Sequence, residues 1–233
     1  MPHQLNWQEI CQMIPKRKAD AQKGDFGRLL CITGSRNMPG ACLLSTQAAL
    51  RGGAGLVTVA TAPENPMRLA AAAPEAMWLP LETDEAGFLR SSDQNRKTLE
   101  KQLSRANAVL LGCGLGVTEE TRRLVHWVLE QAVCPVVLDA DGLNCAVSCI
   151  ELSRRTGKDW ILTPHPGEMA RLTGHSIPQI QENRVETATQ FAAAYPVTLA
   201  LKGAGTLVAQ RSRLAQNPTG NPGMSRGGSG DVL

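Results

Sequence analysis

Hydrophobic and polar positions along the chain follow a repeated order. Short runs rich in Leu, Val and Ile end at Gly, Asp or Pro, and alanine-rich or amphipathic stretches separate them. The short runs predict strands at Arg28–Thr33, Leu56–Ala60, Ala76–Pro80, Ala108–Leu111, Val136–Asp139, Trp160–Thr163, Val197–Lys202 and Thr206–Ala209. The longer stretches predict helices at Ala41–Arg51, Asn95–Leu103, Glu119–Gln131, Gly142–Cys149, Gly167–Leu172 and Ile177–Ala194. Another helix is expected to begin at Asn6, paired with Glu9, and to end by Pro15.

The order of these elements predicts the architecture. Alternating strands and helices favour a mainly parallel sheet covered by helices on both faces, which is a three-layer α/β/α fold. Only Gly203–Gly205 separates the last two predicted strands, so we expect a hairpin and an antiparallel sheet edge. A chain of 233 residues with 42% hydrophobic content suits one core, and we expect a single domain over residues 1–233.

Composition argues against several classes of protein. The net charge is only +3 and the basic residues are scattered, which gives no support for nucleic-acid or membrane binding. We expect neither a signal peptide nor a membrane anchor, because no apolar run has the required length. The seven cysteines form no C-x-x-C pair and mostly lie in apolar runs, which is typical of small core residues in a reducing compartment. The sequence therefore predicts a cytoplasmic protein without a structural zinc site.

Ligands of such sheets bind beyond the carboxyl ends of the strands. Loops rich in Gly or polar residues follow several predicted strands, and all are expected on one rim: Gly34–Gly40, Gly112–Gly116, Asp139–Asn144, Thr163–Glu168 and Lys202–Thr206. The segment Asn217–Asp231 should reach the same rim. Its five glycines can turn backbone N–H groups toward a phosphate, which would place Asp231 beside a reacting hydroxyl. The alternative is a long flexible surface loop.

Two further glycine motifs are less specific. Gly112-Cys-Gly-Leu-Gly116 lacks the G-x-G-x-x-G spacing of a dinucleotide site, so it is either a backbone surface for a ligand or a tight turn. Lys202-Gly-Ala-Gly-Thr206 lacks the order of a Walker loop, but Lys202 can still reach a phosphate or adenosine from a strand end.

Polar residues at the ends of predicted strands are candidates for ion and ligand contacts. Asp139 can orient a magnesium ion through water. Asp141 is either a helix N-cap or a functional residue. His165 lies between two prolines on the expected rim, which favours contact with a ligand over an ordinary loop position. Glu168 is expected in the first turn of a helix, where the helix dipole favours a carboxylate.

Three long motifs, Thr163-Pro-His-Pro-Gly-Glu168, Lys202-Gly-Ala-Gly-Thr206 and Asn221-Pro-Gly-Met-Ser-Arg-Gly-Gly-Ser-Gly-Asp231, occur in this order after Gly34-Ser-Arg-Asn-Met-Pro-Gly-Ala41 and Gly112–Gly116. Together they resemble the ADP/ATP-dependent NAD(P)H-hydrate dehydratase family, from about Lys23 to the last residue. The resemblance implies a ribokinase-like fold and a metabolite-repair lyase for the S-form of hydrated NADH and NADPH. In that family the hydroxyl of the hydrate is phosphorylated and phosphate is then eliminated. Bacterial members typically prefer ADP and eukaryotic members ATP.

The resemblance also implies a role for each matching residue. The hydrate would contact Ala41, Gly116, His165 and Asp231, with Asp231 as the catalytic base. The nucleotide would contact Lys202, Gly203, Ala204, Gly205 and Thr206 together with Gly227, Gly228, Ser229 and Gly230. Asp139 and Glu168 would hold Mg²⁺ through water. A base, a cation and a cradle for oxyanions are what phosphorylation of a hydroxyl requires. A homo-oligomer, tetrameric in related bacterial proteins, and functional pairing with an NAD(P)H-hydrate epimerase are further expectations.

One departure concerns the C-terminus. The family continues past Asp231-Val-Leu233, so we expect the chain to be incomplete there and less soluble and less active than a longer form. Because two residues follow Asp231, we expect no helical turn after it. Two alternatives stay open: a ribokinase-like kinase of a small molecule such as a vitamin precursor, and a nucleotide-binding fragment without catalysis. His165 stands where kinases of the wider fold often carry Asn, which speaks against a sugar kinase.

Overall fold

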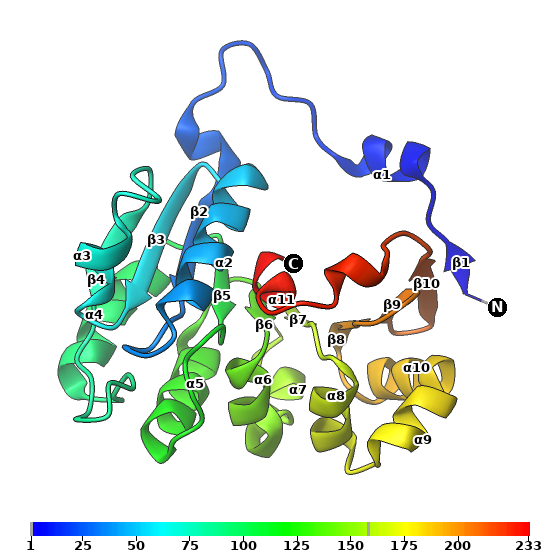
Figure 1. The fold of residues 1–233 in the computed structure, drawn as a ribbon. Helices are drawn as coiled ribbons and strands as arrows, with labels where there is room; N and C mark the ends of the chain where they lie inside the picture. Colours follow the sequence, from blue (N-terminus) through cyan, green and yellow to red (C-terminus); the bar gives the residue numbers. More distant parts are fainter. Residues whose placement is uncertain (1, 158) are drawn as a thin grey trace.

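A central sheet of ten strands organises the computed structural model, which describes residues 2–157 and 159–233 (Figure 1). Its strand order is β1-β10-β9-β8-β7-β6-β5-β2-β3-β4. Neighbouring strands run parallel except at β8–β9 and β9–β10, which are antiparallel. The strands are β1 (His3–Gln4), β2 (Arg28–Ile32), β3 (Leu56–Thr61), β4 (Met77–Pro80), β5 (Ala108–Leu111), β6 (Val136–Leu138), β7 (Trp160–Leu162), β8 (Val197–Leu201), β9 (Thr206–Gln210) and β10 (Arg213–Asn217). The predicted parallel sheet with an antiparallel edge is confirmed.

Helices cover both faces of this sheet, as expected for three layers. One face carries α2 (Pro39–Arg51), α3 (Asn65–Leu69) and the short α11 (Ser229–Val232), which packs against α2 (Figure 1). The other face carries α4 (Asp93–Leu103), α5 (Glu119–Gln131), α6 (Asp141–Ala146), α7 (Leu152–Thr156), α8 (Pro166–Thr173), α9 (Ile177–Glu182) and α10 (Arg184–Ala194). Short 3-10 turns are η1 (Lys23–Phe26), η2 (Val147–Cys149) and η3 (Pro222–Met224).

The larger core lies between the sheet and the helices from α4 to α10. Alternate residues of each strand point into it, and Trp160, Leu138 and Leu199 are fully buried there. The opposite face of the same strands is less covered, because Val137 and Ala200 are partly exposed. A smaller core lies under α2 and α3.

Helix α1 (Trp7–Met13) lies apart from the sheet, and none of its residues is buried (Figure 1). Its N-terminus is the predicted one, since the Asn6 side chain accepts from the Glu9 N–H at 3.0 Å. Cys11 on this helix is exposed, whereas the other six cysteines are buried. The prediction that most cysteines are core residues is therefore confirmed for those six.

Some element boundaries differ from the predictions. The predicted helix Ile177–Ala194 is two helices, because Asn183 takes φ −123° and ψ 40° and ends α9 before α10 begins. The predicted helix Gly142–Cys149 consists of α6 followed by η2. Four strands end one residue earlier than predicted, so Thr33, Asp139, Thr163 and Lys202 begin the loops at the carboxyl edge. The elements β1, α3, α7 and β10 were not predicted.

Candidate functional site

The carboxyl ends of β8, β7, β6, β5 and β2 form one edge, because these strands are consecutive neighbours and parallel. The five predicted loops therefore lie on one rim, as expected. Gly34 N donates to Cys113 O at 2.8 Å, which joins the loops after β2 and β5. A Cβ placed on Gly114 would lie 2.8 Å from the Cβ of Ala41, so the first turn of α2 packs directly on the glycine loop.

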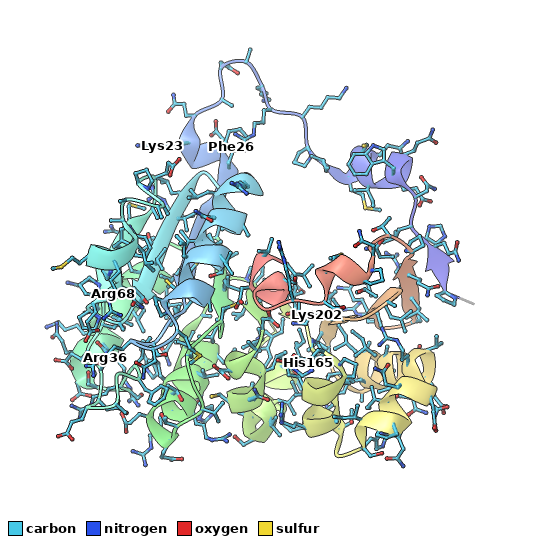
Figure 2. The ribbon with its side chains drawn as sticks, viewed as in Figure 1. Lys23, Phe26, Arg36, Arg68, His165 and Lys202 are labelled. Atoms are coloured by element: carbon cyan, nitrogen blue, oxygen red, sulfur yellow. The ribbon has the colours of Figure 1, made fainter. Side chains whose placement is uncertain are left out.

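Lys202 lies near His165 (Figure 2) and contacts two carboxylates of this rim. Its Nζ donates to Oδ1 of Asp139 at 2.6 Å and lies 3.9 Å from Oε2 of Glu168. Asp139 and Glu168 are only 4% and 5% exposed. The ammonium group compensates one of the two buried carboxylate charges, so the cluster keeps an excess of negative charge that suits a cation.

Asp231 lies against this cluster. A Cβ on the preceding Gly230 would lie 3.4 Å from Lys202 Nζ and 3.8 Å from Asp139 Oδ2. Burial and then the Asp139 charge raise the pKa of Asp231 above its ordinary value, while a hydrogen bond from the Cys113 thiol and the Lys202 charge oppose the shift. A raised pKa brings a carboxylate closer to the value of an effective proton acceptor.

The turn that carries Asp231 begins earlier than expected. Helix α11 starts at Ser229, two residues before Asp231, so the expectation that the two residues after Asp231 leave too few for a helical turn is wrong. Gly228 precedes it with φ +86°, and a Cβ there would lie 2.5 Å from Cδ1 of Leu44 on α2. Only glycine fits both the backbone conformation and the contact. The glycine segment is thus packed against α2 at Gly228 and is not wholly a free loop.

His165 has a structural role that the sequence did not indicate, and contact with a ligand stays a prediction. Its Nδ1 accepts from the N–H groups of Gly167 and Glu168 at 3.0 and 3.3 Å, which makes it the N-cap of α8. Its Nε2 lies 3.3 Å from Oε1 of Glu168, yet 52% of the side chain is exposed. The ring is therefore fixed in place while its edge remains accessible (Figure 2). Burial raises the pKa of Glu168 beneath it.

Arg184 fixes the start of the Lys202–Thr206 turn through hydrogen bonds. The guanidinium donates to the carbonyl oxygens of Leu201 and Lys202 at 3.1 and 3.2 Å. A Cβ on Gly203 would lie 2.9 Å from Arg184 Nη1, and Gly203 has φ +140°. Ala204 at the tip is exposed. Arg184 lies on a helix 18 residues before Lys202, outside any motif, so the sequence alone does not single it out.

Asp141 does not have the predicted capping role. The N-cap of α6 is Ala140, so the N-cap interpretation is wrong. The Asp141 carboxylate instead accepts from Gly116 N at 2.7 Å, which ties the loop after β5 to the loop after β6. The carbonyl oxygen of Gly116 accepts from Thr121 Oγ1 at 3.0 Å.

The donor set for a metal is sparse. Within residues 2–157 and 159–233, no group of three or more His, Cys, Asp or Glu side chains is placed to hold a metal ion. Asp139 and Glu168 share Lys202 as their cation. This arrangement fits magnesium that keeps its waters and takes most other ligands from a bound phosphate group, and it does not fit a metal site built from protein ligands alone.

No helix in the described parts of the chain is long and apolar enough to cross a membrane.

Comparison with known proteins places these features in context. The sequence model of a family described as NAD(P)H-hydrate dehydratase matches residues 29–233. The chain is 40% identical over 230 residues to a bifunctional NAD(P)H-hydrate repair enzyme of Coxiella burnetii, covering 98% of this chain and 44% of that protein. The chain thus spans less than half the length of that bifunctional relative.

Solved structures show the same fold. A Bacillus subtilis ADP/ATP-dependent NAD(P)H-hydrate dehydratase, co-crystallised with ATP and Mg²⁺, superposes with a TM-score of 0.80 at 30% identity, over 99% of this chain and 78% of that one. A ribokinase-like superfamily protein of Enterococcus faecalis superposes with a TM-score of 0.81 at 27% identity, over 99% and 76%. The expected ribokinase-like fold is confirmed.

Proposed function

Because the chain belongs to the NAD(P)H-hydrate dehydratase family, we propose that it uses ADP or ATP to dehydrate the S-form of hydrated NADH and NADPH. The observation that carries this proposal is the position of Asp231. Its carboxylate follows the glycine segment and lies beside Lys202 and Asp139, at the edge where the Lys202–Thr206 turn also ends. The activity is metabolite repair, since it returns damaged cofactors to NADH and NADPH.

The proposed hydrate site lies between α2 and α8. In this site the hydrate would contact Ala41, Gly116 and the exposed edge of the His165 ring. Asp231 accepts the proton of the hydrate hydroxyl. These assignments agree with a rim on which the loop of Gly116 touches α2 and the cap of α8 reaches Lys202 through Glu168.

The proposed nucleotide site is formed by Lys202–Thr206 and by the glycines from Gly227 to Gly230. Lys202 can exchange its contact with Asp139 for a phosphate oxygen, and the exposed turn at Gly203 and Ala204 would contact adenosine. Bound Mg²⁺ would neutralise charge on the phosphate oxygens, with Asp139 and Glu168 as partners of its water shell. Ala204 and Ser229 are the remaining residues of the proposed nucleotide site, and neither side chain is charged.

The chemistry of the proposal follows from the leaving group. Hydroxide leaves poorly, so the hydroxyl oxygen first takes the terminal phosphoryl group while Asp231 holds its proton. The C–O bond to phosphate then breaks and the adjacent ring carbon loses a proton to water, which regenerates the double bond of NADH. The nucleotide loses one phosphoryl group, so ATP yields ADP, and ADP yields AMP.

A direct experiment mixes the protein with hydrated NADH, Mg²⁺ and either ADP or ATP. Recovery of the absorbance band of reduced nicotinamide, with one phosphate released per NADH, is the expected result. A phosphorylated product without recovered NADH would establish the small-molecule kinase instead. Nucleotide binding without any product would favour the non-catalytic fragment. Comparing ADP with ATP gives the preference.

We extend the proposal to the cellular setting. The buried cysteines agree with a reducing, cytoplasmic location. The bifunctional repair enzyme of Coxiella burnetii suggests that an epimerase supplies the S-form to this site. Assembly as a homo-oligomer stays a prediction, and light scattering of the purified protein would test it.

A further inference from the structure

The segment between β4 and α4 forms a small hairpin closed by a bridge between Thr83 and Leu89. Asp84 shapes its tip, because its backbone N–H donates to Phe88 O and its carboxylate accepts from Phe88 N, both at 2.9 Å. Leu89 is fully buried beneath it. Phe88 therefore has a fixed backbone.

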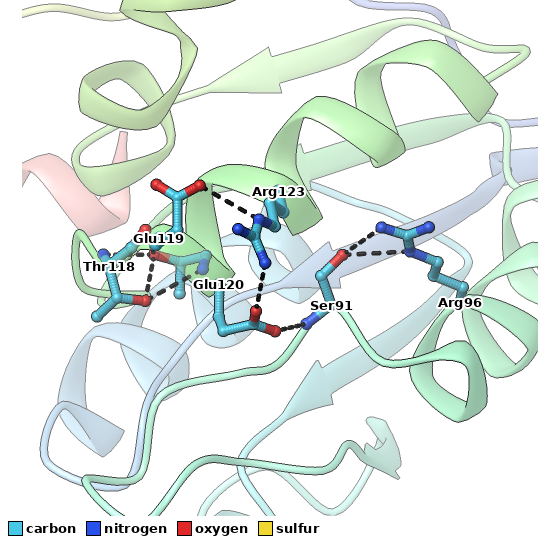
Figure 3. Close-up of polar contacts among 7 residues, drawn as sticks. Ser91, Arg96, Thr118, Glu119, Glu120 and Arg123 are labelled. Atoms are coloured by element: carbon cyan, nitrogen blue, oxygen red, sulfur yellow. Dashed lines mark hydrogen bonds and ion pairs between the residues drawn. The ribbon is translucent and has the colours of Figure 1, made fainter.

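Polar contacts anchor this hairpin to its neighbours. Arg36, in the loop after β2, donates from its backbone N to Gly87 O at 2.9 Å. At the far end, Ser91 N donates to Oε2 of Glu120 on α5 at 2.9 Å, and Arg123 holds the other carboxylate oxygen at 3.3 Å (Figure 3). The hairpin is thus tied to the rim at one end and to a core helix at the other.

The anchored hairpin places the Phe88 ring directly on Gly116. A Cβ at Gly116 would lie 2.2 Å from Cε1 and 2.4 Å from Cδ1 of the ring, and Gly116 has φ +77°. No other residue fits this position without displacing Phe88. The ring itself is only partly buried.

Gly116 has no polar group left for a ligand. Its N–H donates to Asp141, and its carbonyl oxygen accepts from the Thr121 hydroxyl at 3.0 Å and faces the Cys145 thiol at 4.0 Å. Gly116 itself is buried, so what this position presents to a ligand is the partly exposed Phe88 ring, next to Val117, which is 41% exposed. An aromatic face of this kind packs against the apolar face of a ligand ring.

We propose that Phe88 packs against the nicotinamide half of hydrated NADH or NADPH and so determines the affinity for that substrate. This inference rests on the proposed function, because it takes the Gly116 loop as part of the hydrate site. Phe88 acts as a specificity-determining contact, and it takes no part in proton or phosphoryl transfer.

The first test is Phe88→Leu, which keeps an apolar side chain and removes the ring. The KM for hydrated NADH should rise about tenfold while kcat stays within about twofold, because a contact equal in ground state and transition state affects only KM. The KM for ADP should not change, and Phe88→Tyr should restore most of the affinity. Phe26→Leu is the matched control, since Phe26 is also partly buried but contacts Arg17 far from the rim.

Two further measurements separate the possible outcomes. The hydrate of reduced nicotinamide mononucleotide lacks adenosine, so the defect of Phe88→Leu should persist with it, and disappearance of the defect would overturn the assignment to the nicotinamide half. Fluorescence titration with NADH tests the contact without turnover, and equal Kd values for parent and variant would overturn the inference. An inactive parent that still shows the Kd difference would refute the dehydratase and leave the contact standing. A melting temperature that falls in Phe88→Leu together with a raised KM for ADP would indicate a structural role only.

Discussion

Among single residues, Asp231 has the central role in the proposed reaction, because its carboxylate is the base. Asp231→Asn keeps the size and the packing of the side chain but cannot accept the hydroxyl proton. We expect turnover of hydrated NADH to fall by about 10²–10⁴, the usual contribution of a positioned base. Binding of ADP, measured by calorimetry, should persist. Turnover within a few-fold of the parent would assign the base to another residue.

The surroundings of Asp231 predict a pH dependence. The Cys113 thiol lowers the pKa of Asp231, so Cys113→Ala should raise that pKa further and move the acid limb of kcat/KM to higher pH. Asp139→Asn should move the limb to lower pH, because it removes a negative charge and leaves Lys202 free to stabilise the Asp231 carboxylate. Measuring kcat/KM against pH for both variants and the parent checks the direction of each shift. Shifts in the same direction would contradict the assignment of the limb to Asp231.

Sequence motifs predicted the residues that carry charge and glycine at the rim, but not those that position them. Asp231, Lys202 and His165 stand in long motifs whose residue types are themselves informative. Cys113 was predicted only as a core residue, and Arg184 and Phe88 were not singled out. Each of these acts through a contact between distant segments: Cys113 with Asp231, Arg184 with the turn after β8, and Phe88 with Gly116.

Among the secondary-structure elements, the entry into α11 is the most constrained. Gly228→Ala should cost about 1–2 kcal/mol for the left-handed backbone, and it must also displace Leu44. We expect nucleotide affinity to fall about tenfold as Asp231 and Gly230 shift. Gly174→Ala is the matched control, because Gly174 also has a left-handed backbone (φ +75°), no atom lies within 4 Å of its added Cβ, and it is outside the proposed nucleotide site. Equal ADP affinities for the two variants would show that the conformation of Gly228 is dispensable.

The periodic pattern predicted the buried strands and long helices well, since burial on one or both faces leaves a clear apolar signal. It failed for β10 and β1, whose residues are mostly polar and lie at the sheet edge. It also joined α9 and α10, because the apolar spacing continues across Asn183 while the backbone does not. Edge pairing and a single non-helical residue depend on tertiary contacts that no local pattern reports.

The whole molecule should respond to its ligand by becoming more stable. A ligand at about one hundred times its Kd adds about 2.7 kcal/mol to the free energy of unfolding, which for a domain of this length is about 5–10 °C in melting temperature. We expect ADP or ATP with Mg²⁺ to give such a shift and NAD⁺ alone to give less. Differential scanning fluorimetry measures both, and the reverse ranking would contradict a nucleotide site on this rim.

The exposed position of Cys11 makes the native chain behave chemically as a single-thiol protein. Thiolates are the reactive species, and burial raises the pKa of Cys31 to about 12 and also raises the pKa of Cys42 and Cys149. A thiol reagent should therefore modify one cysteine rapidly in the native state and all seven after denaturation. Two or more fast-reacting thiols would indicate that the core opens. A fluorophore coupled to Cys11 would then report how α1 moves relative to the sheet, without mutation of the six interior cysteines.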